Sequence, residues 1–474
     1  MPFEAVIGLE IHVEMKTKSK MFSSAPVSFG ADPNTKTVPL DFAFPGTMPV
    51  VNKQAVINAI RVSNALHMSI DHELWFDRKN YFYSDLPKGY QITQQARPIG
   101  SLGYLDIETS NGNKHIRIER LHMEEDTCKQ LHSWDCSLLD YNRAGIPLIE
   151  IVSMPDMRSG EEAMKYVEKI RSIVTFLDVS DGKMEEGSLR CDVNISIRPV
   201  GEEKLGTKVE IKNLNSIQNV QKAIDFETKR QIEIVTNGGT VRQETRRFDE
   251  ASKETVLMRV KTDAVDYKYF TEPNIVPIKL SDEFVDEAIR TSPELAESKL
   301  IRYKEIGLSD YDAGQLILDK DVSIYYDEAL KSNASPKLLA NWVLGDVQSI
   351  LNKDNISIKE FKISPLHLGE LIKIIESGKV SNKQAREVFA EMLKDDASPN
   401  ELIKKMGTSM ISDEGEILKL VQEVIDANPQ SIIDYKNGKD RAVGFLVGQI
   451  MKKTQGKVNP ALTNKLVVEE LKRR

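Results

Sequence analysis

Within residues 6–14 of the chain, hydrophobic and polar residues alternate strictly from Leu9 to Glu14. The apolar positions are Ile7, Leu9, Ile11 and Val13. The positions between them carry Glu10, His12 and Glu14. Successive side chains of a strand point to opposite faces, so this stretch predicts a strand with one buried face and a carboxylate–imidazole–carboxylate row on the other. Taken alone, the row fits either a solvated strand face or a site for metal or phosphate chemistry.

The same alternation recurs later, over residues 188–198 and 207–213. The charged residues on these two polar faces are Arg190, Asp192, Arg198, Lys208, Glu210 and Lys212. A run over 148–152 is apolar except for Glu150, whose burial costs free energy unless it has a partner. A dense acidic cluster follows His122, at residues 124–126. Together these stretches predict a sheet whose open face is a site.

Beyond about residue 292 the pattern becomes helical. Before that point we expect short strands, with one helix at about 159–177 and another after Ser216. After it, Ser335 and Ser364 each precede a proline, which is typical of a helix N-cap followed by Pro at the first helical position. We therefore predict an α+β protein with a strand-rich domain over 1–292, an all-helical domain over 293–406 and a small helical tail domain over 407–474.

Composition describes an ordinary soluble globular protein, with 474 residues of which 40% are hydrophobic and 29% charged. We find no apolar run of about 18 residues and no secretory signal, so we expect no membrane span and a cytoplasmic location. The three cysteines, Cys128, Cys136 and Cys191, lack C-x-x-C spacing. Their small number argues against a disulfide framework and favours a reducing compartment.

Charge is unevenly distributed along the chain. Residues 431–474 carry ten lysines or arginines against four acidic residues, a net charge of +6. The whole chain carries −8, so the remainder carries −14. A basic terminal module on an acidic body indicates a polyanionic partner, although a solvated basic helix fits the charge count equally well.

The acidic residues on the predicted open face suit a hard cation. Mg²⁺ prefers carboxylate oxygens, and the available ligands are Glu10, Glu125, Glu150, Asp192 and Glu210. The imidazole of His12 suits Mn²⁺ or Zn²⁺ better, or it orients a carboxylate. Arg190, Lys208 and Lys212 would neutralise phosphoryl oxygens. The sequence contains neither a P-loop nor a Rossmann glycine fingerprint.

Aromatic and basic residues are interleaved over residues 77–90. Such a stretch can stack bases and pair with phosphates, or it can be an aromatic core hairpin with a basic rim. Residues 239–247 pose the same choice between a phosphate-binding strand and a plain surface strand. The chain has no G-x-S-x-G elbow, and Cys191 falls on the apolar side of its strand. If the reaction consumes ammonia, we expect another protein to produce it.

Six motifs together resemble the GatB family, the B subunits of the aspartyl/glutamyl-tRNA amidotransferase complex GatCAB. They are GLEIHV at 8–13, RKNYFY at 78–83, DLPKGYQ at 85–91, NRAGIPLIE at 142–150, EGSLRCD at 186–192 and KVEIKNLN at 208–215. The resemblance runs the length of the chain and is densest over residues 1–290. The tail is similar to the YqeY-like module of that family.

The resemblance implies a cradle domain, a helical domain and a tail that touches tRNA. It implies an ATP-dependent carbon–nitrogen ligase with glutamine as amido donor. ATP would phosphorylate the side-chain carboxylate of misacylated Glu-tRNA(Gln), Asp-tRNA(Asn) or both. Ammonia from the amidase subunit GatA would then displace phosphate, with the small GatC subunit holding the pair together.

The resemblance also implies roles for individual residues. The expected Mg²⁺ region is Glu10, His12, Glu125 and Glu150, followed by Asp192 and Glu210. The expected catalytic residues are Glu125, Lys79, Asp85 and Lys88, the last three near the ammonia route or the acceptor end of the tRNA. The expected tRNA contacts in the tail are Lys452, Lys453 and Lys457.

One departure from the family pattern concerns zinc. Many similar proteins carry four cysteines early in the chain, where this sequence has Ser23, Ala25, Val38 and Asp41. None of these residues can supply a thiolate, so we predict no structural zinc. Two rival functions remain at this point: a metal-dependent phosphodiesterase, which would cleave RNA without ATP, and a non-catalytic RNA-binding scaffold.

Overall fold

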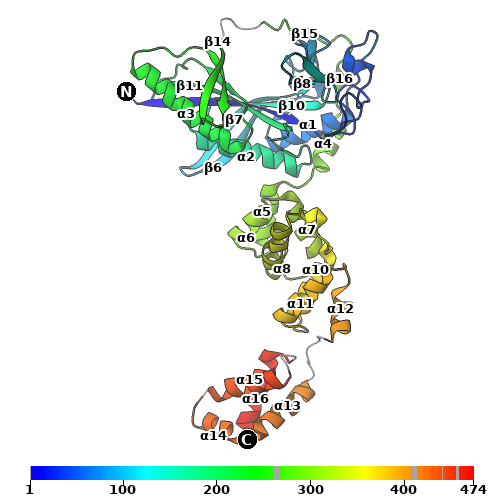
Figure 1. Ribbon diagram of the computed structural model, residues 1–474, viewed down its shortest axis with the longest axis vertical. Coiled ribbons are helices and arrows are strands. Elements are labelled where there is room, and N and C mark those ends of the chain that lie inside the picture. Colours follow the sequence, from blue (N-terminus) through cyan, green and yellow to red (C-terminus); the bar gives the residue numbers. More distant parts are fainter. Residues whose placement is uncertain (1, 261–265, 408–413, 440, 455–457) are drawn as a thin grey trace. The chain divides into compact units, whose positions relative to one another are not determined.

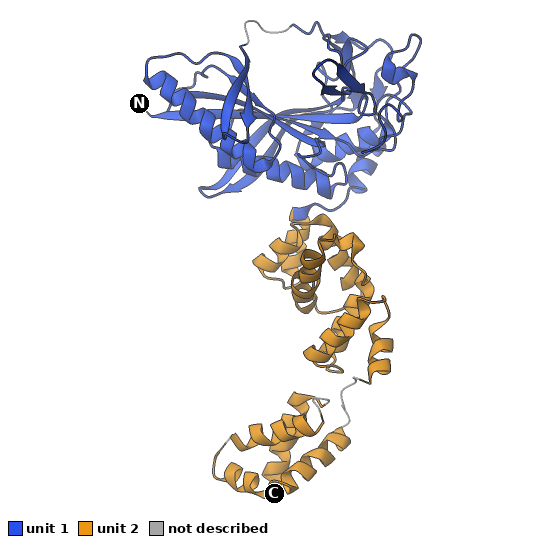
Figure 2. Cartoon of the chain, in the orientation of Figure 1, with its two compact units in different colours: residues 1–296 blue, residues 297–474 orange. Residues whose placement is uncertain are grey.

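The computed structural model describes residues 2–260, 266–407, 414–439, 441–454 and 458–474. The chain divides into two compact units, residues 1–296 and 297–474 (Figure 2). The first unit is built on a large sheet and the second contains helices. This arrangement confirms the predicted α+β class, with a strand-rich part followed by a helical part.

A nine-stranded sheet forms the centre of the first unit, and its middle strands are β11, β1, β10 and β7 (Figure 1). In spatial order the strands are β14 (Glu254–Val260), β13 (Glu244–Asp249), β12 (Val209–Lys212), β11 (Leu189–Pro199), β1 (Phe3–Glu14), β10 (Pro147–Ser153), β7 (Gly112–Glu125), β6 (Gly100–Thr109) and β2 (Ser69–Ile70). Neighbouring strands pair antiparallel except β12 and β13, which are parallel. The strands predicted over 6–14, 148–152 and 188–198 are β1, β10 and β11.

Three helices cover one face of this sheet (Figure 1). They are α1 (Lys53–Ala65), α2 (Gly160–Phe176) and α3 (Ile217–Thr236). Ser159 and Ser216 cap α2 and α3 with their hydroxyl oxygens, which confirms both predicted helices. The alternate apolar residues of β1, from Ile7 to Val13, are buried in the core beneath the helices. The polar residues between them therefore project from the other face.

Short strands flank the large sheet. β4 (Asp77–Asn80) pairs with β5 (Tyr90–Thr93) and β15 (Phe270–Thr271), and β3 (Glu73–Leu74) pairs with β16 (Ile278–Lys279). β8 (Lys129–His132) and β9 (Ser137–Asp140) form a hairpin. A 3-10 turn, η1 (Pro39–Phe42), and helix α4 (Asp282–Arg290) complete the unit.

The described part of the second unit is helical. Its α-helices are α5 (Ala296–Glu305), α6 (Asp310–Leu316), α7 (Lys320–Leu330), α8 (Pro336–Trp342), α9 (Gln348–Asp354), α10 (Pro365–Glu376), α11 (Asn382–Met392), α12 (Pro399–Met406), α13 (Glu414–Asp426), α14 (Pro429–Lys436), α15 (Arg441–Lys453) and α16 (Pro460–Arg473). α8 and α10 begin at the prolines after Ser335 and Ser364, as predicted. Buried apolar residues form one cluster over 303–403 and another over 417–471.

No helix among the described residues combines the length and the apolar character that a membrane crossing requires.

Candidate functional site

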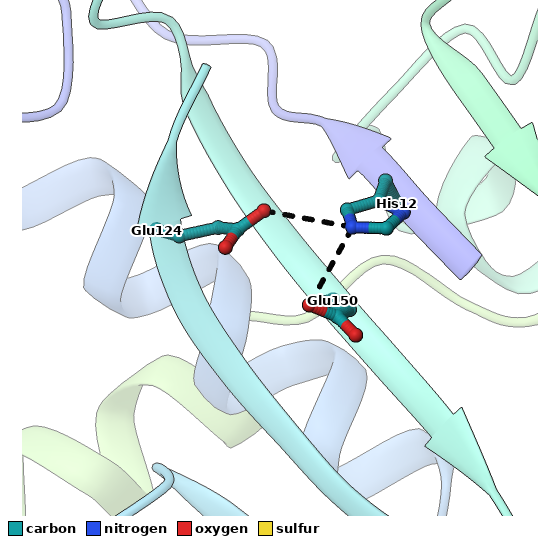
Figure 3. Close-up of side chains that lie close together, drawn as sticks. All are labelled: His12, Glu124 and Glu150. Carbon is teal, nitrogen blue, oxygen red and sulfur yellow. Dashed lines mark ion pairs between the residues drawn. The ribbon is translucent and has the colours of Figure 1, made fainter. Parts of the chain in front are cut away.

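Two histidines and two glutamates meet on the open face of the sheet. The strand register places His12 of β1 opposite Glu150 of β10, and Glu150 opposite His122 of β7. His12 Nε2 lies 3.4 Å from Glu150 Oε2 and 3.7 Å from Glu124 Oε1 (Figure 3). His122 Nε2 lies 3.2 Å and 3.8 Å from the same two carboxylates. Three neighbouring strands thus bring these side chains together.

The charges of this cluster depend on one another. Burial would lower the pKa of His12, but the carboxylates of Glu150 and Glu124 outweigh it and raise that pKa. The same balance raises the pKa of His122 to about 9. Burial would raise the pKa of Glu150, but the two imidazoles hold it well below its ordinary value. The cluster therefore presents an ionised carboxylate compensated by two imidazoles.

His12, Glu124 and Glu150 form a donor set suited to a divalent ion. Each offers one ligand atom, and the three atoms lie within 4.8 Å of one another. Two carboxylate oxygens and an imidazole nitrogen suit Mg²⁺, Mn²⁺ or Zn²⁺. His122 contacts both carboxylates from the far side and so can orient them. We call His12, Glu124 and Glu150 the first acidic group.

A second acidic group consists of Glu10, Asp192 and Glu210, from β1, β11 and β12. All three donors are oxygens, which is the ligand type of a hard cation. The ammonium of Lys212 already lies 2.5 Å from Asp192 Oδ2 and 3.2 Å from Glu210 Oε1. Burial would lower the pKa of Lys212, but Asp192 and Glu210 raise it. This lysine therefore compensates part of the negative charge of the group.

The second group is also held by neighbouring polar side chains. Asn194 Nδ2 donates to Glu10 Oε1 at 2.8 Å. The hydroxyl of Thr245 donates to Glu210 Oε2 at 2.9 Å. These bonds orient two of the three carboxylates from β11 and β13.

Arg190 lies opposite His12 in the sheet register. Its Nη2 donates to Asp126 Oδ2 at 2.7 Å, and Arg143 approaches the same carboxylate. Burial would raise the pKa of Asp126, but Arg190 and Arg143 lower it. Burial and the neighbouring Asp126 raise the pKa of Glu14 to about 8. A phosphate bound by Arg190, as expected from the sequence, would therefore share the guanidinium with Asp126.

Glu125 lies outside both acidic groups, although it was expected as a metal ligand and as a catalytic residue. Its carboxylate is buried, forms an ion pair with Lys88 and accepts the backbone N–H of Ile92 at 3.0 Å. Lys88 and Glu125 line a small cavity together with Asp85. Glu124 takes the position next to His12, and sequence reasoning did not single it out. The sequence does contain a signal for Glu124: alternate residues of a strand lie on one face, so Glu124 shares its face with His122.

The remaining expected residues are spread over the molecule. Asp85 accepts the hydroxyl of Thr127 at 3.0 Å, and Lys208 is exposed just before β12. Lys79 Nζ lies 5.0 Å from the ring centroid of Tyr267. Lys452 and Lys453 end α15, where Lys453 pairs with Glu423 at 2.6 Å. Lys457 lies outside the described residues.

The positions matching a zinc site are held by polar contacts. Asp41 accepts the hydroxyl of Ser23 at 3.0 Å and the backbone N–H of Val38 at 2.9 Å. The buried ammonium of Lys20 lies 3.1 Å from Asp41 Oδ2. Lys20 also donates to the carbonyl of Tyr141 at 2.9 Å. A buried ion pair thus ties this segment to the loop before β10.

The two buried cysteines show no sign of activation. Cys128 and Cys191 are buried, and Cys136 is exposed. Burial raises the pKa of the Cys128 thiol to about 11 and raises that of Cys191 well above its ordinary value. A nucleophilic cysteine requires a lowered pKa, so these two buried thiols do not fit that role.

Two family models match the chain. The GatB/GatE catalytic domain matches residues 5–286, and the GatB domain matches residues 324–471. The first match contains both acidic groups, and the second covers most of the helical unit.

Curated relatives extend over the full length of the chain. The chain is 50% identical over 475 residues to a protein of Lysinibacillus sphaericus, covering 100% of both chains. It is 51% identical over 476 residues to proteins of Bacillus cytotoxicus and Bacillus cereus, again covering 100% of both. All three relatives are named as the B subunit of an aspartyl/glutamyl-tRNA(Asn/Gln) amidotransferase. This chain therefore belongs to the GatB family of amidotransferase B subunits.

Proposed function

We propose that this chain carries the kinase and amidation site of a tRNA-dependent amidotransferase. The site phosphorylates the side-chain carboxylate of Glu-tRNA(Gln) or Asp-tRNA(Asn) with ATP and exchanges the phosphate for ammonia. The observation that carries the proposal is the first acidic group, which lies on the open face of the sheet with Arg190 opposite His12. The names of the relatives supply the two tRNA substrates.

The residues present suit an Mg²⁺–ATP substrate. His12, Glu124 and Glu150 would hold the ion, and the second acidic group offers further oxygen ligands. When bound, Mg²⁺ supplies positive charge that neutralises phosphate oxygens. Arg190 and Lys79 add fixed positive charge near the same face. Burial would lower the pKa of each side chain, but the neighbouring carboxylates raise it, so both remain protonated. His122 keeps the two glutamates oriented.

We propose that the ammonia comes from a glutaminase partner, GatA, and that GatC joins the complex. This is supported by the subunit designation in the relatives' names and by the raised thiol pKa values of Cys128 and Cys191. Lys88 and Glu125 line a small cavity in the same unit, which suits a role in admitting a small polar reactant. We place the enzyme in the cytoplasm, where its aminoacyl-tRNA substrates are made.

We further propose the domain boundaries 1–292, 293–406 and 407–474 and assign tRNA binding to the tail. The separate apolar cluster over residues 417–471 supports a tail with its own core. Lys452 at the end of α15 is one of its basic residues.

The test is ATP hydrolysis and amide formation by the complex with purified GatA and GatC partners, Mg²⁺ and misacylated Glu-tRNA(Gln). Wild-type protein should release phosphate and form Gln-tRNA, and Glu150→Gln should lose both. Glu119→Gln is the matched control, because Glu119 is an exposed acid on β7 outside both acidic groups. A third variant, Glu125→Ala, asks whether the Lys88–Glu125 pair serves the same reaction.

The outcomes are distinct. An active control together with an inactive Glu150→Gln variant supports the assignment. Phosphate release that survives Glu150→Gln would move the kinase site elsewhere in the chain. A wild-type complex without ATP-dependent amide formation contradicts the proposed function, and RNA cleavage without ATP would favour the phosphodiesterase alternative.

A further inference from the structure

Four tyrosines form a continuous row in the first unit. Tyr83 lies 5.9 Å from Tyr81, Tyr81 lies 6.0 Å from Tyr267, and Tyr267 lies 6.0 Å from Tyr269, measured between ring centroids. The planes of neighbouring rings are inclined by 65° to 73°, so each pair meets edge to face. We call these residues the tyrosine row.

The row is assembled from two segments that are far apart in sequence. Its first two members follow β4, and its last two precede β15. β4 and β15 are paired strands. Asn80 fixes the second segment, since its backbone N–H donates to the carbonyl of Tyr267 at 3.0 Å and its amide donates to the carbonyl of Lys268 at 2.8 Å. The row is therefore a built feature of the fold.

Lys79 lies against the middle of the tyrosine row. Its ammonium is 5.0 Å from the ring centroid of Tyr267 and 5.8 Å from that of Tyr81. Within the described part of the chain, its ammonium forms no ion pair with a carboxylate. Burial would lower its pKa, but Glu124 and the Tyr269 hydroxyl outweigh it, so Lys79 stays protonated. It is a half-buried cation that has no carboxylate counter-ion among the described residues.

The ends of the row are exposed to solvent. The exposed fraction is 61% for Tyr83 and 39% for Tyr269, and the adjacent Phe82 reaches 88%. These values do not fit an aromatic core hairpin, which was one of the two interpretations of residues 77–90. The negative charge of Glu150, in the first acidic group, contributes to the raised pKa of both Lys79 and Tyr269.

We propose that the tyrosine row and Lys79 form a subsite for an adenosine nucleotide, whose base stacks on the exposed rings and whose phosphate pairs with Lys79. Aromatic rings bind bases by stacking, and a lysine ammonium binds phosphate as a point charge. The inference rests on the proposed function, which involves two such ligands. One is ATP, and the other is the 3′-terminal adenosine of the aminoacyl-tRNA.

Kinetics of the full complex can separate these two ligands. Because the two exposed rings lie at opposite ends of the row, we expect the base to stack on one of them. Either Tyr83→Leu or Tyr269→Leu should therefore raise KM about tenfold for one substrate, since base stacking contributes about 1–3 kcal/mol per base. Tyr83→Phe and Tyr269→Phe keep the rings and should restore the wild-type KM. Phe29→Leu is the control, since Phe29 is an exposed aromatic residue of the same unit outside the row.

A direct binding measurement complements the kinetics. ATP and tRNA are each prepared with a fluorescent purine analogue in place of the adenine concerned, and the wild-type complex is titrated with each. Stacking on the row should quench the emission of one analogue, and the leucine variant with the raised KM should lose the quenching. This signal does not depend on turnover.

The kinetic and binding results distinguish ATP from the tRNA end as the ligand of the subsite. A raised KM for ATP assigns the subsite to ATP, and a raised KM for tRNA assigns it to the tRNA end. Unchanged KM values and unchanged quenching in both leucine variants overturn the inference while leaving the proposed function intact. Leucine variants that fail to assemble with GatA and GatC show a protein contact instead, which also overturns it. An inactive wild-type complex contradicts the proposed function itself.

Discussion

His12 and Glu150 face each other across two neighbouring antiparallel strands, with Nε2 3.4 Å from Oε2. His122 approaches the same carboxylate oxygen from the next strand, at 3.2 Å. One carboxylate of β10 therefore joins imidazoles from β1 and β7. Glu150 lies closer to both imidazoles than Glu124 does, since the Glu124 oxygens are 3.7 Å from His12 and 3.8 Å from His122.

Replacing Glu150 should weaken binding of a divalent ion. Glu150→Gln removes one negative charge and one ligand oxygen, so we expect the Kd for Mn²⁺ to rise at least about tenfold. Isothermal titration calorimetry with the purified chain measures this without any substrate. Glu119→Gln, on the exposed part of β7, should bind as the wild type does. Equal Mn²⁺ affinity in both variants would contradict the assignment.

Removing Lys88 should impair amidation. The Lys88 ammonium is the ion-pair partner of Glu125, and its loss leaves a buried carboxylate uncompensated. We expect Lys88→Ala to lower the rate of both ammonia-dependent and glutamine-dependent Gln-tRNA formation by about tenfold or more. Lys204→Ala, at an exposed lysine, is the control. If both rates stay unchanged, Lys88 has no part in the reaction.

The buried pair of Lys20 and Asp41 should contribute to stability. Asp41→Asn leaves the Lys20 ammonium unpaired in a site where its side chain has no solvent exposure, at a cost of about 3 kcal/mol in the free energy of unfolding. The double variant Lys20→Met/Asp41→Leu should recover part of that loss. Urea unfolding measures both effects.

Metal analysis of the purified protein should find no bound zinc. Zinc bound near residues 23–41 would contradict our alignment of this segment with the family pattern.

Asp327 in α7 should make stability depend on pH. Its carboxylate pairs with Lys299 and Arg302 and accepts the hydroxyl of Tyr303 at 3.0 Å. Burial would raise its pKa, but Arg302 and Lys299 outweigh it and lower the pKa below the ordinary value. A carboxylate with a depressed pKa contributes stability above its unfolded pKa of about 3.9 and loses it as the pH falls through the folded pKa.

The corresponding variant is Asp327→Asn. At neutral pH we expect it to lower the free energy of unfolding by about 2 kcal/mol, and the difference from the wild type should shrink as the pH falls below the unfolded pKa of about 3.9. A urea titration in which hydrogen exchange of the α7 amides is the readout measures the stability of this region. Asp321→Asn, which breaks a more exposed pair with Lys359, should change stability by less than about 1 kcal/mol. A difference that persists in acid would exclude Asp327 ionisation as the cause.

Deleting residues 407–474 should weaken tRNA binding. The last 44 residues of this segment, 431–474, carry a net charge of +6. Loss of phosphate contacts should raise KM for the aminoacyl-tRNA and reduce the salt dependence of binding. KM for ATP should stay unchanged and serves as the internal control. Equal tRNA KM values for the full and truncated chains would refute a tail contact.

Local pattern predicted the framework of the first unit well. The alternation over residues 6–14 indicated both the strand and the side chains that face the core, and β1 confirms them. Ser159 and Ser216 marked the starts of α2 and α3 for a physical reason, since each hydroxyl satisfies a free backbone N–H. These features depend on neighbours close in sequence.

The composition of the candidate site was harder to predict. Three adjacent acids follow Met123, and sequence alone does not say which of them points toward His12. The β7–β10 register decides it: His122 and Glu124 share the face of Glu150, and Glu125 turns toward Lys88. Tyr267 and Tyr269 were missed because strand pairing, and not sequence proximity, brings them to Lys79.

The order of strands in the sheet has a consequence for synthesis of the protein. β10 lies between β1 and β7, yet it is the last of the three to leave the ribosome, since it ends at Ser153. A nascent chain that stops before β10 has neither Glu150 nor the strand that brings His12 beside Glu124. A truncated product that ends before β10 therefore cannot assemble the first acidic group, because completion of this group waits for the strand that is made last of the three.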